Sequence, residues 1–165
     1  GAWFYTGGDN PYGYRGLGEV AVFVFFGLVA VLGTEFTQSG TISWPGAMAA
    51  VAIGAISASV NLANNLRDIP SDTEAGKVTL AVRLGDAGTR TVWVALACMP
   101  LATSVALAFA TPWALAGLLA APLIFVASRP VTGNAKGPAL IPVLGMSGRA
   151  MLLWAVVTAL ALALG

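Results

Sequence analysis

Apolar residues fill five long stretches of the chain, and polar residues are largely confined to the segments between them. The apolar stretches run over residues 17–33, 44–66, 91–110, 112–128 and 148–165. A helix needs about 20 apolar residues to cross the ~30 Å hydrocarbon core of a bilayer. The pattern therefore predicts an all-α, multi-pass transmembrane helix bundle, with five spans in a single transmembrane domain over residues 1–165.

The second stretch, 44–66, differs from the others because it is rich in glycine, alanine and serine. Within a membrane, small side chains let helix backbones approach closely, and such packing drives association where the hydrophobic effect does not. We therefore expect this helix to lie at the centre of the bundle.

The basic residues predict which loops face the cytoplasm. With five spans, all of them lie in or beside loops on one side of the membrane: Arg15, Arg67, Lys77, Arg83, Arg90, Arg129, Lys136 and Arg149. Arg129 and Lys136 belong to a predicted loop over 129–148, whose apolar run 139–146 is too short to span, and Arg149 opens the fifth span directly after it. The opposite loops carry no lysine or arginine. The positive-inside rule makes the charged side cytoplasmic, as expected for a multi-pass protein of the plasma membrane.

Composition limits the chemistry available to such a bundle. The chain is 58% hydrophobic and 9% charged, whereas soluble domains carry roughly a quarter charged residues. Its formal net charge of +1 gives no reason to expect nucleic acid as a partner. It has no histidine, which excludes a histidine base and histidine metal ligands. Catalysis within these residues must use carboxylates, lysine, arginine, hydroxyls, amides or a metal.

One polar stretch, 64–86, holds nearly half of the charged residues. It contains four of the seven acidic and three of the eight basic residues: Asp68, Asp72, Glu74 and Asp86, with Arg67, Lys77 and Arg83. Asn64, Asp68 and Asp72 follow one another at intervals of four, which places them on one face of a continuous helix. Pro70 lacks a backbone N–H and clashes with the carbonyl four residues earlier. We therefore expect the helix to kink or end near Asp68, with Asp72 in a fresh turn.

Paired carboxylates at the cytoplasmic end of a span favour a metal–phosphate site. Two nearby carboxylates repel each other unless protonated or bridged by a cation. Mg²⁺ suits them, because it takes one or two carboxylates together with waters and substrate phosphates. Lys77 and Arg83 are placed to donate to phosphate oxygens. The same residues also fit plain interfacial anchors, in which Arg67 makes surface ion pairs worth ~0–1 kcal/mol, and the pattern alone leaves both interpretations open.

The order of residues in this stretch resembles that of a known family. Residues 64–85 read NNLRDIPSDTEAGKVTLAVRLG, which is similar to the second aspartate motif of the UbiA superfamily of intramembrane prenyltransferases. Residues 5–20, YTGGDNPYGYRGLGEV, look most like the branch that prenylates 1,4-dihydroxy-2-naphthoate. The similarity runs from Tyr5 to Arg90 and continues weakly in the ALIPVL and GR segments before the last span.

The resemblance implies a nine-helix bundle whose last five helices are the five spans, with a cytoplasmic active site and a lipid-facing tunnel. It implies that Mg²⁺, held by two aspartate motifs, binds a polyprenyl diphosphate. The ring of 1,4-dihydroxy-2-naphthoate then attacks the allylic carbon with loss of CO₂, giving demethylmenaquinone for menaquinone biosynthesis. The first aspartate motif is absent from these residues. We therefore expect N-terminal helices carrying it as a partner, and an inactive chain without them.

The resemblance also assigns roles to the residues of the aspartate motif. Asp68 and Asp72 would be the metal ligands, or one of them would position or deprotonate the acceptor. Asn64 would hold a metal-bound water or the acceptor.

Four further residues are expected to bind substrate. Lys77 and Arg83 would contact the diphosphate, Tyr5 would lie near the acceptor, and Arg15 would meet the acceptor carboxylate.

Three other charged residues carry separate expectations. Glu19 is either a helix cap or part of the site. Arg67 is expected to point away from the face of Asn64 and Asp68. Glu35, on the far side of the membrane, is expected to be solvated.

Two other functions compete with this interpretation. A UbiA-type enzyme could use another aromatic acceptor, such as hydroxybenzoate, homogentisate, chlorophyllide or haem. A transporter half would place acids along an ion path. The acidic residues instead gather at one face of the membrane, and the middles of the spans carry none.

Overall fold

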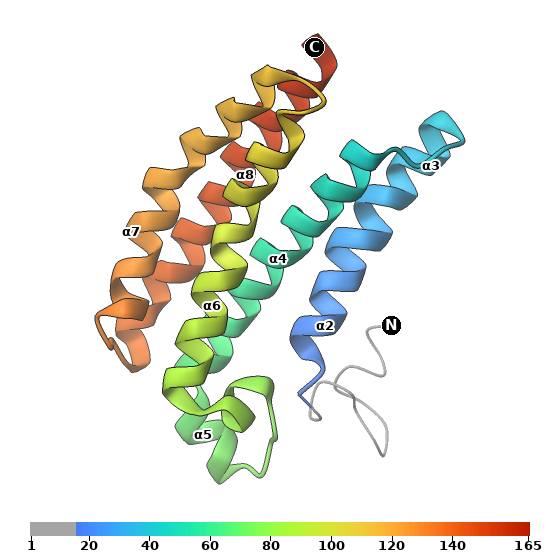
Figure 1. Ribbon diagram of the computed structural model, residues 1–165. Helices are drawn as coiled ribbons and strands as arrows, with labels where there is room; N and C mark the ends of the chain where they lie inside the picture. Colours follow the sequence, from blue (N-terminus) through green and yellow to red (C-terminus); the bar gives the residue numbers. More distant parts are fainter. Residues whose placement is uncertain (1–15) are drawn as a thin grey trace.

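The computed structural model describes residues 16–165, and throughout this range the chain consists of helices joined by short turns (Figure 1). Five helical segments are long and apolar enough to cross a membrane: Gly18–Ser39, Trp44–Arg67, Leu80–Leu107, Pro112–Thr132 and Gly137–Leu164. The predicted all-α bundle of five spans is confirmed.

Several spans combine more than one type of helix. The first comprises α2 (Gly18–Val22), the π-helical η2 (Phe23–Leu32) and α3 (Gly33–Ser39), the second is α4 (Trp44–Arg67), and a short α5 (Ile69–Glu74) follows it. The third is α6 (Leu80–Leu107), the fourth joins the 3₁₀ segment η3 (Pro112–Ala120) to α7 (Ala121–Thr132), and the fifth joins η4 (Gly137–Leu140) to α8 (Ile141–Leu164).

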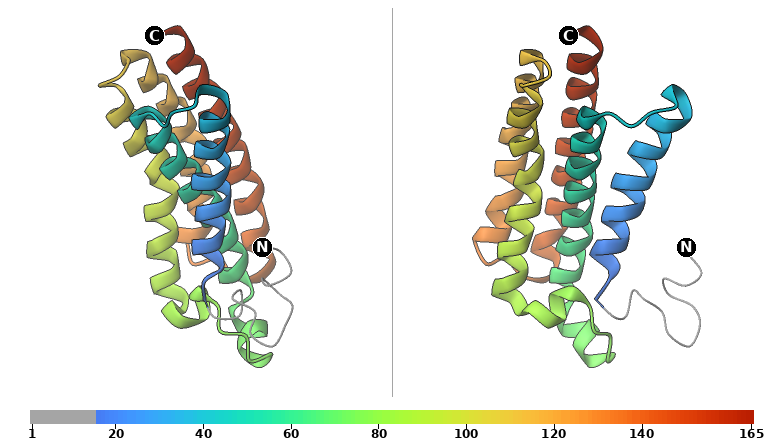
Figure 2. Two further views of the ribbon diagram at one scale, coloured as in Figure 1. Left: turned by 90° about the vertical axis from the view of Figure 1, so that its right-hand side faces the viewer. Right: turned by 45° about the vertical axis from the view of Figure 1, so that its right-hand side comes forward.

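The central helix is α4, as its small residues predicted. It packs against η2, α6 and α8. Figure 1 and the right-hand view of Figure 2 show it between α6 and the first span. Half of its most apolar segment is buried, against 6% for Gly18–Ser39. The Ser43 hydroxyl accepts the Gly46 N–H at 3.1 Å and so caps the start of α4.

Glycines bring η2 and α4 into close contact. A Cβ atom at Gly27 would lie 2.6 Å from the carbonyl oxygen of Ala50 and 2.6 Å from Cα of Gly54. A Cβ atom at Gly54 would lie 2.8 Å from a ring carbon of Phe23. Because no larger residue fits at either position, the two glycines set the distance between these helices.

The fifth span begins earlier than predicted. The predicted loop over 129–148 is wrong, because α7 continues to Thr132 and the next helix starts at Gly137. Pro138 and Pro142 lie in the first two positions of η4 and α8, where a missing N–H breaks no helical bond. Arg149, predicted at the opening of the fifth span, therefore lies ~18 Å along it, at 1.5 Å per residue.

The third span also begins earlier, at Leu80. The Thr79 hydroxyl accepts the Val82 N–H at 3.3 Å and caps the helix. Gly85, with φ of 67°, interrupts regular geometry within α6. Most of residues 80–90, which were predicted to lie before the third span, are therefore helical. Asp86 and Arg90 lie one turn apart on α6.

The two ends of the bundle differ in charge. One end holds the start of α2, α5, the start of α6 and the turn between α7 and η4, at the bottom of Figure 1. Its turns and helix ends carry most of the basic residues: Arg67, Lys77, Arg83, Arg90, Arg129 and Lys136. The opposite end holds α3 and the start of α4. That the basic end faces the cytoplasm stays a prediction.

At that opposite end, Glu35 is not simply solvated as expected. Its Oε1 accepts hydrogen bonds from the backbone N–H and the hydroxyl of Ser43, at 3.1 and 2.5 Å. The contact closes the turn between α3 and α4, because it joins the end of the first span to the cap of the second.

We expect Gly27→Val to lower the thermal unfolding midpoint of the protein in detergent. The added side chain must push η2 away from α4, and overpacking of this kind typically costs about 1–3 kcal/mol. Gly33→Val is the matched control, because Gly33 has a helical φ of −62° and a Cβ atom there meets nothing within 4 Å. Equal midpoints for the two variants would contradict the close contact.

Candidate functional site

The candidate site forms where α4 ends. The last residue of α4 is Arg67, and Asp68 (φ −97°, ψ 5°) leaves helical geometry and joins α4 to α5. Pro70 lies in the first two positions of α5, where proline is tolerated. The prediction that the helix ends near Asp68 and places Asp72 in a fresh turn is confirmed.

Backbone hydrogen bonds link the three residues of the predicted triad across this junction. The Asp68 N–H donates to the Asn64 carbonyl at 3.2 Å, and the Asp72 N–H donates to the Asp68 carbonyl at 2.8 Å. Because both are i to i+4 bonds, the backbone still advances by one turn between successive members, although Asp68 itself leaves helical geometry. Asn64 also lines an apolar groove of about 460 Å³, together with Val22, Phe26, Ser57, Val60, Asn61, Leu144, Gly148 and Met151.

Each carboxylate of the triad is paired with a cation. The Nε and Nη2 atoms of Arg67 donate to the Asp68 carboxylate at 2.6 and 2.7 Å. This hydrogen-bonded guanidinium lowers the pKa of Asp68, so the carboxylate is ionised at neutral pH. Arg67 does not point away from Asp68 as predicted, because helical spacing no longer applies where α4 ends.

Asp72 is buried and pairs with Lys77, whose ammonium donates to its two carboxylate oxygens at 3.1 and 3.3 Å. The turn after α5 makes this possible. Gly76 adopts φ of 69°, and the next N–H, of Lys77, donates back to the Asp72 carbonyl at 2.8 Å. A left-handed glycine with this bond is a Schellman ending, which reverses the chain and returns Lys77 to Asp72.

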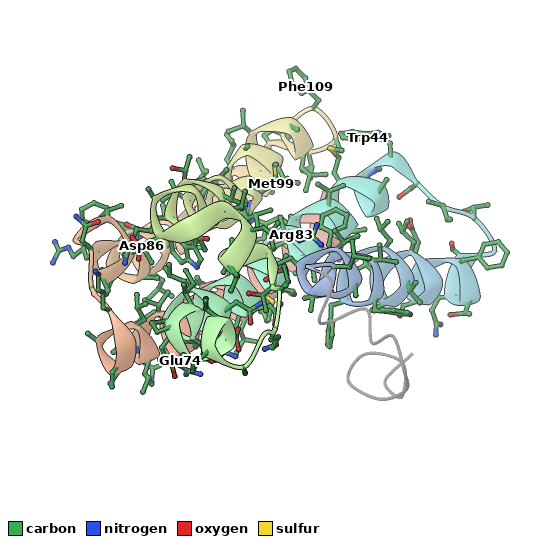
Figure 3. The ribbon with its side chains drawn as sticks, turned by 90° about the horizontal axis from the view of Figure 1, so that it is seen from below. Trp44, Glu74, Arg83, Asp86, Met99 and Phe109 are labelled. Carbon is green, nitrogen blue, oxygen red and sulfur yellow. The ribbon has the colours of Figure 1, made fainter. Side chains whose placement is uncertain are left out.

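The other predicted substrate contacts are less closely joined to the triad. Arg83 is exposed on α6. A Cβ atom added at Gly16, just before the first span, would lie 3.1 Å from the Nε of Arg83, so the two residues are close together. Seen from below, Arg83 lies toward that span and Asp86 on the side of α7 and α8 (Figure 3). Tyr5 and Arg15 lie outside the described residues.

A residue left open by the sequence, Glu19, is part of the neighbouring structure. It is 4% exposed on α2, and its Oε1 accepts the side-chain amides of Asn61 at 3.2 Å and Asn65 at 2.6 Å. Its Oε2 is buried with no hydrogen-bond partner among the described residues. These bonds cross from α2 to α4 on both sides of Asn64. In the sequence, the interval of four between Asn61 and Asn65 indicates two amides on one face of α4, but it does not indicate Glu19 as their partner.

The donor set of Asp68 and Asp72 fits part of a magnesium site. Mg²⁺ in proteins usually takes one or two carboxylates and completes its shell with water and phosphate oxygens. Within residues 16–165, no group of three or more acidic, histidine or cysteine side chains gathers around one point. The described residues therefore supply at most two carboxylates, both already balanced by cations that a metal would replace.

Comparisons with known proteins place the chain in one family. The model of the UbiA prenyltransferase family matches residues 1–139. A protein of Mycobacterium tuberculosis (strain ATCC 25618 / H37Rv) named 1,4-dihydroxy-2-naphthoate octaprenyltransferase is 56% identical over 165 residues, which cover 100% of this chain and 56% of that protein. The Escherichia coli (strain K12) protein of the same name is 39% identical over 155 residues, which cover 90% of this chain and 49% of that protein.

A more distant relative is UbiA prenyltransferase domain-containing protein 1 of Gallus gallus. It is 32% identical over 134 residues, covering 78% of this chain and 38% of the relative. No solved structure gives a significant match. The chain spans about half the length of the bacterial relatives that it matches.

We expect Glu19→Ala to lower the unfolding midpoint more than Glu19→Gln does. Alanine leaves two amide groups without their acceptor, and an unsatisfied buried polar group costs about 1–3 kcal/mol. Glutamine keeps one side-chain oxygen as an acceptor. Glu74→Ala, at an exposed position on α5, serves as the control and should leave the midpoint unchanged. A Glu19→Ala midpoint equal to that of the control would disprove the bridging role.

Proposed function

The chain belongs to the UbiA prenyltransferase family, and on this premise we propose that its protein prenylates 1,4-dihydroxy-2-naphthoate. The donor is an allylic polyprenyl diphosphate, and CO₂ and diphosphate are released. The observation that carries the proposal is the triad of Asn64, Asp68 and Asp72, whose backbones are joined by i to i+4 hydrogen bonds at the end of a membrane span. Asn64 also lines an apolar groove. The names of the bacterial relatives support the choice of acceptor.

Asp68 and Asp72 would hold Mg²⁺ together with a further aspartate motif on helices outside these residues. When bound, Mg²⁺ supplies positive charge to the oxygens of the leaving diphosphate. Lys77, which pairs with Asp72, would donate to the diphosphate oxygens once a metal balanced that carboxylate. Arg83, exposed on α6, would be a second donor.

The groove beside Asn64 suits the hydrocarbon part of the donor. Its lining is mostly apolar, with Phe26, Val60 and Leu144 from three different spans, and its polar side chains are Ser57, Asn61 and Asn64. An apolar wall excludes water from the allylic carbon, which becomes cationic as the diphosphate leaves. The Asn64 amide, between groove and carboxylates, is placed to hydrogen-bond a hydroxyl of the acceptor.

The proposed reaction balances without an added oxidant. The allylic C–O bond breaks and its electron pair leaves with the diphosphate. The ring carbon that bears the carboxylate bonds to the allylic carbon, and the bond to the carboxylate then breaks. Its electrons restore the aromatic ring as CO₂ departs. The product is the quinol form of demethylmenaquinone, so the proposal assigns the protein to menaquinone biosynthesis. We expect its active site at the cytoplasmic face of the plasma membrane, as the basic residues predict.

We expect Asp68→Asn and Asp72→Asn each to reduce turnover by more than about 100-fold, because even residues that only support a metal ligand are worth 10–100-fold. The assay uses membranes containing the full-length protein, with 1,4-dihydroxy-2-naphthoate, a polyprenyl diphosphate and Mg²⁺. Glu74→Gln, the exposed acid of the same stretch, is the control and should retain activity. Undiminished turnover in either aspartate variant would remove that residue from the metal site.

The same membranes test the acceptor. Product from 1,4-dihydroxy-2-naphthoate but not from hydroxybenzoate or homogentisate supports the proposal. Product from another aromatic acceptor alone would keep the prenyltransferase chemistry and overturn the choice of acceptor.

A further inference from the structure

A second cavity lies at the same end of the bundle as the triad. Its volume is about 180 Å³, and none of Asn64, Asp68 and Asp72 lines it. Its walls come from three places: the junction of α4 and α5, the start of α6, and the start of the fifth span. The lining residues are Leu66, Arg67, Ile69, Pro70, Asp86, Arg90, Lys136 and Gly137. The proposed reaction uses neither this cavity nor its three cations, Arg67, Arg90 and Lys136.

Arg90 holds one wall of this cavity in place. It is 7% exposed, and its Nε and Nη2 atoms donate to the Asp86 carboxylate at 2.6 and 2.9 Å. The same guanidinium donates to the carbonyls of Val131 at 2.6 Å and Ala135 at 2.7 Å. These bonds fasten the turn after α7 to α6 and so place Lys136, the next residue, at the cavity.

Two basic groups at the cavity retain donors for a ligand. Lys136 is exposed, and the salt bridges formed within residues 16–165 belong to Arg67, Lys77 and Arg90 rather than to it. Arg67 uses Nε and Nη2 for Asp68, and its Nη1 donates to no acceptor within residues 16–165.

The charge balance around the cavity favours an anion. Arg67 and Arg90 are each balanced by one carboxylate, of Asp68 and Asp86 respectively. Lys136 then leaves one positive charge. The fifth span begins at Gly137, so the positive end of a 28-residue helix adds to this charge.

We propose that this cavity binds the phosphate group of an anionic phospholipid headgroup. Basic pockets between membrane helices on the cytoplasmic side are suited to such headgroups. The Lys136 ammonium and the Arg67 Nη1 donate to the phosphate oxygens, while Arg90 holds the wall. Leu66, Ile69 and Pro70 line the same cavity and provide an apolar side for the glycerol and the first carbons of the chains.

The lipid is the favoured source of this phosphate because the cavity lies at the end of four membrane spans. A headgroup is held at that level by its own acyl chains, whereas free phosphate would have to bind from solution through few donors. Binding of the headgroup does not depend on prenyl transfer. The site can therefore be tested without turnover, and its test is independent of the proposed function.

The test is a titration of phosphatidylglycerol into the full-length protein in neutral detergent, with the rise in unfolding midpoint giving an apparent affinity. We expect Lys136→Gln to weaken this affinity about fivefold, the effect of one basic residue near an anionic surface. Lys136→Arg keeps the charge and should bind as the native protein does. Phosphatidylcholine should not raise the midpoint in a saturable manner.

Arg129→Gln is the matched control, because Arg129 lies at the same end of the bundle but stacks on the Phe125 ring, 5.0 Å from its centre, and does not line the cavity. It should change the affinity less than about twofold. Equal losses in Lys136→Gln and Arg129→Gln would show diffuse attraction and overturn the site. Saturable stabilisation by inorganic phosphate, lost in Lys136→Gln and not increased by phosphatidylglycerol, would overturn the lipid as the source.

Discussion

Close packing against α4 is the constraint on which the rest of this structure depends. A bilayer provides no hydrophobic drive for helix association, so contact must come from small residues that let backbones meet. Gly27 and Gly54 do this between η2 and α4, and α6 and α8 pack against other faces of α4. Because the triad lies at the end of this same helix, the packing that holds the bundle together also positions the chemistry.

The end of α4 shows how a few local signals build a site. Pro70 and the non-helical Asp68 break the helix without breaking the sequence of i to i+4 bonds through Asn64, Asp68 and Asp72. Gly76 then reverses the chain, so that the acid and the base of one short segment meet. The outcome is a pair of carboxylates, each bound to a cation of its own.

Local patterns in the sequence predict much of this architecture, and long-range contacts account for what they miss. Spans follow from apolar runs, and the triad follows from its spacing. The starts of α6 and the fifth span were placed too late, because charged residues and prolines in the first turns of a helix resemble a loop. The bonds from Glu19 to Asn61 and Asn65 join residues 42 and 46 positions apart, which no local pattern reveals.

Gly85 has a consequence for how α6 fits a bilayer. A helix of 28 residues would be ~42 Å long at 1.5 Å per residue, well beyond a hydrocarbon core of ~30 Å. Such hydrophobic mismatch is usually relieved by tilting the helix or thickening the bilayer. The break at Gly85 leaves residues 86–107 as the regular part, ~33 Å long, which is close to the thickness of the core. The first turn of α6, before the break, therefore adds no length that tilting or thickening would have to accommodate.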